Sequence, residues 1–165
     1  MLPIHTILPP TDFSEHSEHA FRLACGLARD YSARLIVLHV WSMPPPVFGE
    51  VVPVPPPTAD AYLAETEQKL HQLQPTGPDV DVEHRLQEGD PVSMILRVAT
   101  EAHVDLIILG THGRTGLSRL LRGSLAEQIL RRAPCPVVAV KNPFLEVEPV
   151  PSAAGRALMP EAMRG

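Results

Sequence analysis

Short apolar runs alternate along the chain with segments in which apolar residues recur every three or four positions. The short runs fit buried β-strands, and the periodic segments fit helices that bury one face. This alternation is typical of repeated β-α-β units, so the sequence predicts an α/β fold around a mainly parallel sheet. We expect five strands, over residues 4–8, 34–40, 80–87, 105–109 and 137–140, and four helices between them.

The expected strands differ in how much of them is covered. Residues 34–40 contain the nearly unbroken apolar run LIVLHV and fit a central strand buried on both faces. Residues 80–87 alternate between apolar and polar side chains. This period of two predicts one solvent-facing side and therefore a strand at the edge of the sheet.

The expected helices have recognisable starts. Asp12 or Ser14 can cap the first, because both residue types accept bonds from the first free N–H groups of a helix. Asp90 followed by Pro91 is a strong start for the third. The second and fourth helices are expected over 59–73 and 124–132. Buried faces are expected at Phe21, Ala24, Cys25 and Ala28 in the first helix and at Val92, Ile95, Leu96 and Ala99 in the third.

Two segments fall outside the pattern. Residues 43–57 hold too many prolines for a helix or a central strand, so we expect an extended surface loop, which could also be a lid or a partner-binding strip. Residues 143–165 lack sustained periodicity and predict a flexible tail, with a docked strand or partner arm as the alternative. The expected organisation is one domain over residues 1–142 followed by the tail.

Composition and charge narrow the class of protein. The 165 residues fit a single domain, and a net charge of −5 opposes sequence-independent binding to nucleic acid. No stretch approaches the roughly 20 apolar residues that span a bilayer, and the first residues lack the pattern of an export signal. We therefore expect a cytoplasmic protein with no nucleic-acid or membrane partner.

Cysteines and histidines give no sign of a metal site. Cys25 and Cys135 have neither CxxC nor metal-ligand spacing, so we expect buried, reduced thiols. His16 and His19 could share one helix face, but no third ligand has convincing spacing.

The most informative stretch runs from Gly110 to Ser124, between a buried strand and a helix. Glycines let backbone N–H groups approach a ligand closely, and the start of the following helix favours an anion. The stretch therefore predicts an oligophosphate site. It is not a Walker loop, because Arg122 and Gly123 precede the hydroxyl in place of glycine and lysine. The spacing also differs from GxGxxG, which disfavours NAD.

Gly110, Gly113, Gly123 and Ser124 match the pattern G-x2-G-x9-G-[ST]. Together with the opening Pro10-Thr11-Asp12, the GTHGRTG segment and the run APCPVV over 133–138, this pattern makes residues 3–142 resemble the ATP-binding members of the universal stress protein family.

The resemblance implies a doubly wound, five-stranded parallel sheet of order 3-2-1-4-5, Rossmann-like and similar to the adenine nucleotide alpha hydrolases, with helices on both faces. The ends of the first and fourth strands then lie side by side, at the switch point where such sheets bind ligands. It further implies that Asp12 bonds the ribose of ATP, that Val40 borders the adenine, and that magnesium, or Mn²⁺, arrives with the phosphates. The implied binding residues are Pro10, Thr11, Asp12, Val40, Gly110, His112, Gly113, Arg114, Gly123, Ser124, Leu125 and Ala126.

Plainer interpretations of two of these residues stand beside the functional ones. Ser124 followed by Glu127 is also a capping box, and Asp12 could simply cap the first helix. Three correctly spaced glycines favour the phosphate role for Ser124, whereas the ribose role of Asp12 depends on the implied sheet order.

The sequence thus predicts an ATP-binding regulator or sensor, because no strong catalytic constellation accompanies the glycine segment. One alternative is a slow ATP hydrolase or nucleotidyl transferase, although paired carboxylates or a lysine-centred phosphoryl-transfer set are not evident. The other is a nucleotide-independent interaction protein, but family members of that kind typically have a degraded glycine motif.

The last expected strand predicts self-association. It is apolar on both faces at an expected sheet edge, where unpaired backbone invites a second chain. We expect a homodimer joined near Val137, Val138, Ala139 and Val140, with coverage by the C-terminal tail as the alternative.

Overall fold

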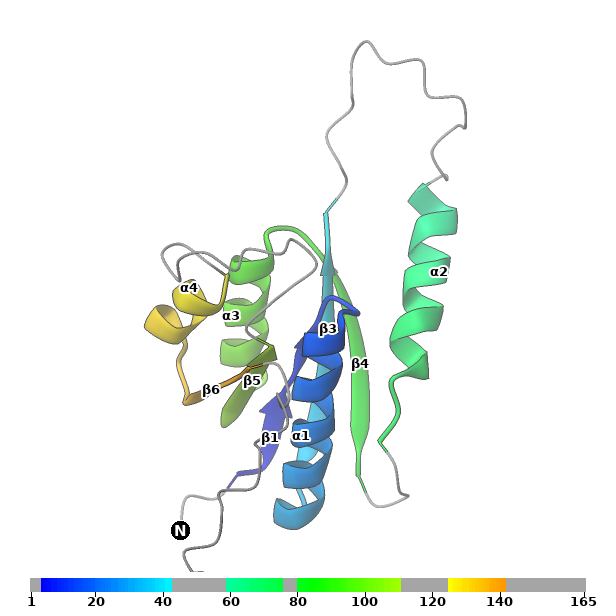
Figure 1. Cartoon of the computed structure of the whole chain (residues 1–165). Coiled ribbons are helices and arrows are strands. Elements are labelled where there is room, and N and C mark those ends of the chain that lie inside the picture. The colour runs from blue at the N-terminus through cyan, green and yellow to red at the C-terminus, as the bar shows by residue number, and fades with distance from the viewer. Residues whose placement is uncertain (1–3, 43–58, 76–79, 111–124, 142–165) are drawn as a thin grey trace, which may run out of the picture.

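The computed structural model of the chain describes residues 4–42, 59–75, 80–110 and 125–141 (Figure 1). The strands are β1 (Thr6–Leu8), β2 (Pro10–Thr11), β3 (Arg34–Trp41), β4 (Val82–Glu88), β5 (Leu106–Gly110) and β6 (Val137–Val140). The helices are α1 (Glu15–Tyr31), α2 (Ala59–Gln72), α3 (Pro91–Glu101) and α4 (Leu125–Arg132). The expected loop over 43–57 and the tail over 143–165 lie outside the described residues.

The strands form one parallel sheet. β1 pairs with β3 on one side and with β5 on the other, β4 lies beyond β3, and β6 lies beyond β5. Counting β1 and β2 as the single first strand, the order is 3-2-1-4-5, which confirms the expected topology.

The first strand is interrupted and longer than expected. Thr6 pairs with Arg34 and Pro10 pairs with Leu38, so β2 continues the register of β1 along β3. Prolines at positions 9 and 10 supply no backbone N–H, and this explains the break in the ladder. The continuation carries the chain to Thr11 and places Asp12 directly after the carboxyl end of β2.

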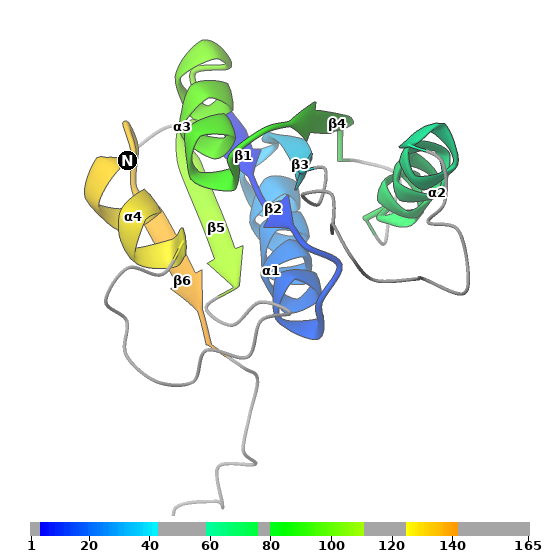
Figure 2. The same cartoon turned by 90° about the horizontal axis from the view of Figure 1, so that it is seen from above.

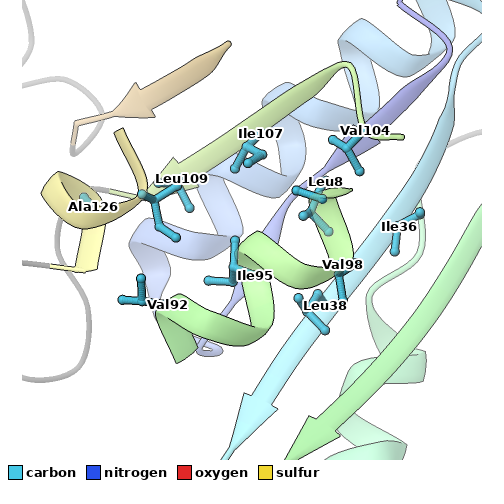
Figure 3. Packing of buried hydrophobic residues seen from close by; sticks show 12 residues of the cluster. Leu8, Ile36, Leu38, Val92, Ile95, Val98, Val104, Ile107, Leu109 and Ala126 are labelled. Carbon is cyan, nitrogen blue, oxygen red and sulfur yellow. The ribbon is translucent and has the colours of Figure 1, made fainter. Parts of the chain in front are cut away.

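Helices cover both faces of the sheet, α1 and α2 on one side and α3 and α4 on the other (Figure 2). The central strand β3 supplies both cores: Leu35 and Val37 pack toward α1, whereas Ile36 and Leu38 pack toward α3. The core on the α3 side is drawn in Figure 3. Its buried members are Leu8, Ile36, Leu38, Val92, Ile95, Val98, Ala99, Val104, Ile107, Leu109, Ala126 and Ile129.

Three expectations about burial need correction. β4 is an edge strand as predicted, but residues 82–87 are half-buried on both faces. On its polar face, Arg97 of α3 donates to Gln87 at 2.7 Å. Leu96 is only partly buried, and Val98 is buried on the same helix instead. Cys25 and Cys135 are also half-buried rather than buried.

The helix starts agree with the chemistry of their first residues. Asp90 caps α3 by accepting a bond from the Ser93 N–H at 2.9 Å, and Pro91 occupies the first turn. Between the two candidates for the first helix, Ser14 is the cap of α1 and accepts from the N–H of Ser17.

Gly110 permits a close approach between α1 and the sheet. A Cβ added at Gly110 would lie 2.7 Å from both the carbonyl carbon and the carbonyl oxygen of His16, in the first turn of α1. Backbone atoms at this distance cannot yield as a flexible side chain would. The absence of a side chain at Gly110 therefore sets how closely α1 packs on the end of β5.

Alanine at Gly110 tests this packing. We expect Gly110→Ala to lower the free energy of unfolding by about 1–3 kcal/mol, because the new methyl group must push α1 away. Gly26→Ala is the matched control, since a Cβ there meets nothing within 4 Å and alanine favours the interior of α1. The control should gain about 0.5–1 kcal/mol. Urea denaturation without nucleotide measures both, and equal stability of the two variants would contradict the close approach.

Candidate functional site

The strand order reverses between the first and fourth strands of the sheet. The chain leaves β2 for α1 on one face and leaves β5 in the direction of α4 on the other (Figure 2). β1 and β5 are hydrogen-bonded neighbours, so the carboxyl ends of β2 and β5 lie side by side. This is the position at which open α/β sheets bind their ligands.

Asp12 stands at one side of this position. Its Oδ1 accepts bonds from the backbone N–H of Ser14, at 3.0 Å, and from the Ser14 hydroxyl. Because Ser14 is the helix cap, the carboxylate supports the cap rather than acting as one.

Hydrogen bonds join the end of β2 to the first turn of α1. Ser17 Oγ donates to the carbonyl of Ser14 at 2.9 Å, and Ser17 therefore has no proton left to give to Thr11. Hence Thr11 Oγ1 donates to Ser17 Oγ, at 3.1 Å, and in turn accepts from the N–H of Phe13 at 3.0 Å. Thr11 and Ser17 are both buried, so these bonds are shielded from water.

Two residues beside Asp12 have unusual settings. Phe13 adopts a positive φ of 60°, and His39 of β3 is a buried polar residue inside an apolar run. Their rings lie 4.4 Å apart, centroid to centroid. The sequence offered no signal for Phe13 or Ser17, but His39 could have been noticed as the polar interruption of LIVLHV.

Of the remaining predicted residues, those that the structure describes fall on the α3 and α4 side of the sheet. Val40, half-buried, packs against the same core that contains Ala126 of α4. Leu125, at the start of α4, is exposed, and Pro10 is half-buried opposite Leu38. His112, Gly113, Arg114, Gly123 and Ser124 lie outside the described residues.

The structure therefore brings together part of the predicted set. Asp12 follows β2, Gly110 ends the neighbouring β5, and Val40 shares a core with Ala126.

Within the described ranges, no three His, Cys, Asp or Glu side chains are grouped in a way that could hold a metal ion. No helix among those ranges is long and apolar enough to cross a membrane.

Comparison with known proteins assigns the fold to a family. The sequence model of the universal stress protein family matches residues 3–141. The chain belongs to the universal stress protein family.

Individual relatives resemble this universal stress protein over most of their length. A universal stress protein of Methanocaldococcus jannaschii is 31% identical over 146 residues, covering 85% of this chain and 84% of the relative. The crystal structure of a family member from Burkholderia pseudomallei is 31% identical with a TM-score of 0.64, over 85% of this chain and 98% of that one. A universal stress protein crystallised in complex with cAMP is 25% identical with a TM-score of 0.57, over 84% and 98%.

Neither cysteine of this universal stress protein has the setting of a reactive thiol. Burial raises the pKa of Cys25 to about 11. Burial, together with the nearby negative charge of Asp105, also raises the pKa of Cys135. Both thiols therefore stay protonated at neutral pH, and nucleophilic chemistry depends on the thiolate.

Thiol labelling tests this conclusion. In a Cys135→Ser variant, iodoacetamide at pH 8 should modify Cys25 about tenfold more slowly in the folded than in the unfolded protein. At pH 8 the thiolate form of Cys25 is about 100-fold scarcer in the folded than in the unfolded protein. A thiolate of higher pKa is more nucleophilic, and this recovers about tenfold of the labelling rate. Because the pKa is raised on folding, raising the pH above 9 should also destabilise the native state, and Cys25→Ala should remove that slope. Labelling as fast as in urea would contradict the burial of this thiol.

Proposed function

We propose that this universal stress protein binds ATP between the carboxyl ends of β2 and β5 and acts as a nucleotide-dependent regulator in the cytoplasm. The observation that carries the proposal is the juxtaposition of Asp12 with Gly110, which opens the G-x2-G-x9-G-S segment. A relative of the same fold was crystallised with cAMP, which supports an adenine nucleotide as the class of ligand.

Each part of the nucleotide has a matching group in this proposal. Asp12 would accept bonds from the ribose hydroxyls while Ser14 holds its Oδ1. Val40 would border the adenine on the α3 side of the sheet. The glycine segment and the first turn of α4 would surround the phosphates with N–H groups, which favour anions. Mg²⁺ or Mn²⁺ would arrive with the triphosphate.

Nucleotide binding by Asp12 can be measured directly. Calorimetry should show ATP binding to the purified protein, and Asp12→Ala should weaken it by about 10- to 100-fold, because bonds to a charged acceptor are lost. Asp30→Ala, an exposed carboxylate near the other end of α1, is the matched control and should bind as the unchanged protein does.

Three outcomes separate the candidate functions. Adenine nucleotide released on denaturing the purified protein, with slow or no turnover, supports a regulator. Multiple-turnover ATP consumption that disappears in Asp12→Ala would favour the hydrolase or transferase. If no nucleotide is released and no heat of ATP binding is found, only an interaction protein remains.

We further propose that two copies associate along β6. In the described part of the sheet β6 pairs only with β5, and its Val138 is 38% exposed. Leu130, on the adjoining α4, is 51% exposed. An apolar edge strand beside an exposed apolar helix residue is the kind of surface that a second chain covers.

A charge at the edge tests this association. Val138→Lys should raise the dimer dissociation constant at least tenfold, because pairing would bury an unpaired ammonium group. Tyr62→Lys is the control, since Tyr62 is similarly exposed but lies on α2, at the opposite edge. Sedimentation velocity over a concentration series measures both. A Val138→Lys protein as dimeric as the control would rule out this edge.

A further inference from the structure

We infer that His39 and Phe13 form a positioning pair that fixes the direction of the Asp12 carboxylate toward the ribose. The inference rests on the proposed nucleotide function and adds to it a second layer of residues that touch Asp12's neighbours rather than the ligand. Its basis is the way in which residues 11 to 13, at the end of β2 and just after it, contact β3 and the first turn of α1.

Phe13 has a backbone conformation that it would not adopt by preference. A φ of 60° is the left-handed region, where a bulky side chain is an outlier and persists only if its surroundings hold it. Two interactions hold Phe13. Its N–H donates to Thr11 Oγ1 at 3.0 Å, and its ring contacts the ring of His39 at a tilt of 34°.

The ring of His39 is itself fixed. His39 pairs with Thr11 in the parallel register of β2 and β3, and its Nδ1 lies 2.7 Å from the carbonyl oxygen of Thr11. A carbonyl oxygen can only accept, so Nδ1 carries the proton and donates it. His39 is 8% exposed, which leaves its ring little room to turn.

Asp12 is therefore held between two anchored neighbours. Thr11 is bonded to His39 through its carbonyl and to Ser17 through its hydroxyl, and Phe13 is held by Thr11 and by the His39 ring. The backbone at Asp12 cannot rotate without breaking one of these contacts, and the bonds from Ser14 hold Oδ1 of the carboxylate. A carboxylate fixed before binding does not lose rotational freedom when the ribose arrives, and this saving raises affinity.

This role differs from that of an ordinary core histidine. A histidine that merely fills the core would affect every ligand equally, because its loss would disturb the sheet as a whole. A positioning residue acts through Asp12 alone. Its loss should therefore be felt only by ligands that carry the hydroxyl groups which Asp12 binds.

The experiment compares ATP with 2′,3′-dideoxy-ATP by calorimetry. The unchanged protein should prefer ATP. His39→Leu should weaken ATP binding by about three- to tenfold and leave the affinity for the dideoxy nucleotide unchanged. In an Asp12→Ala background, His39→Leu should have no further effect on ATP binding. His39→Asn, which keeps a donor near the carbonyl of Thr11, should recover part of the ATP affinity.

Phe13→Gly is the second variant, to be used whether or not His39→Leu folds. Glycine adopts a φ of 60° without strain, so the backbone path is kept while the ring contact is lost. The same selective loss of ATP affinity is expected. Thermal unfolding monitors the fold of each variant.

The outcomes distinguish this inference from the proposed function. Equal losses for ATP and the dideoxy nucleotide in both variants would overturn the positioning role while ATP binding stands. A protein that binds both nucleotides equally well before any substitution would overturn the ribose contact of Asp12, and the positioning role with it. A protein that binds neither would overturn the proposed function itself.

Discussion

The first turn of α1 is the point on which the rest of the site depends. Its backbone at His16 lies against Gly110 at the end of β5, at a distance that no side chain at position 110 would allow. The same turn is bonded to the end of β2 through Ser17 and Thr11. Two strand ends that are 99 residues apart in the sequence, at Thr11 and Gly110, therefore contact one helical turn. Their relative position is set by packing within the protein and needs no ligand to define it.

The close packing of α1 explains why position 110 is a glycine, independently of any phosphate binding. The first glycine of the G-x2-G-x9-G-S pattern is needed for α1 to pack, so its presence alone does not indicate a nucleotide site. The proposed nucleotide site has a second feature, because Asp12 follows the neighbouring strand end and Ser14 orients its carboxylate. The combination of a fixed carboxylate and a glycine-rich segment at neighbouring strand ends is more specific than either feature.

Much of the fold could be predicted from the pattern of apolar residues, because burial on two faces leaves a clear signature. The run from Leu35 to Leu38 sends alternate side chains into two cores, and the sequence indicated a central strand there. The cap at Asp90 could also be predicted, because it depends only on residues within one helical turn. The strand order came from the family resemblance. The extension of the first strand past two prolines, the positive φ of Phe13 and the partial covering of β4 were not predictable, because each depends on contacts with distant residues.

The two sides of the proposed site differ in how they connect a bound ligand to the rest of the protein. On the β2 side, Asp12, Phe13 and His39 are connected to α1 and β3, in the interior of the sheet, so ligand contacts there act on a part that is already fixed. On the β5 side, the glycine segment is followed directly by α4 and then by β6, which carries the exposed Val138. A ligand held by Asp12 and bound through the glycine segment would therefore act on α4 and on β6, the edge strand of the sheet. If nucleotide occupancy regulates a partner or a second copy, α4 and β6 are the elements through which the fold connects the two.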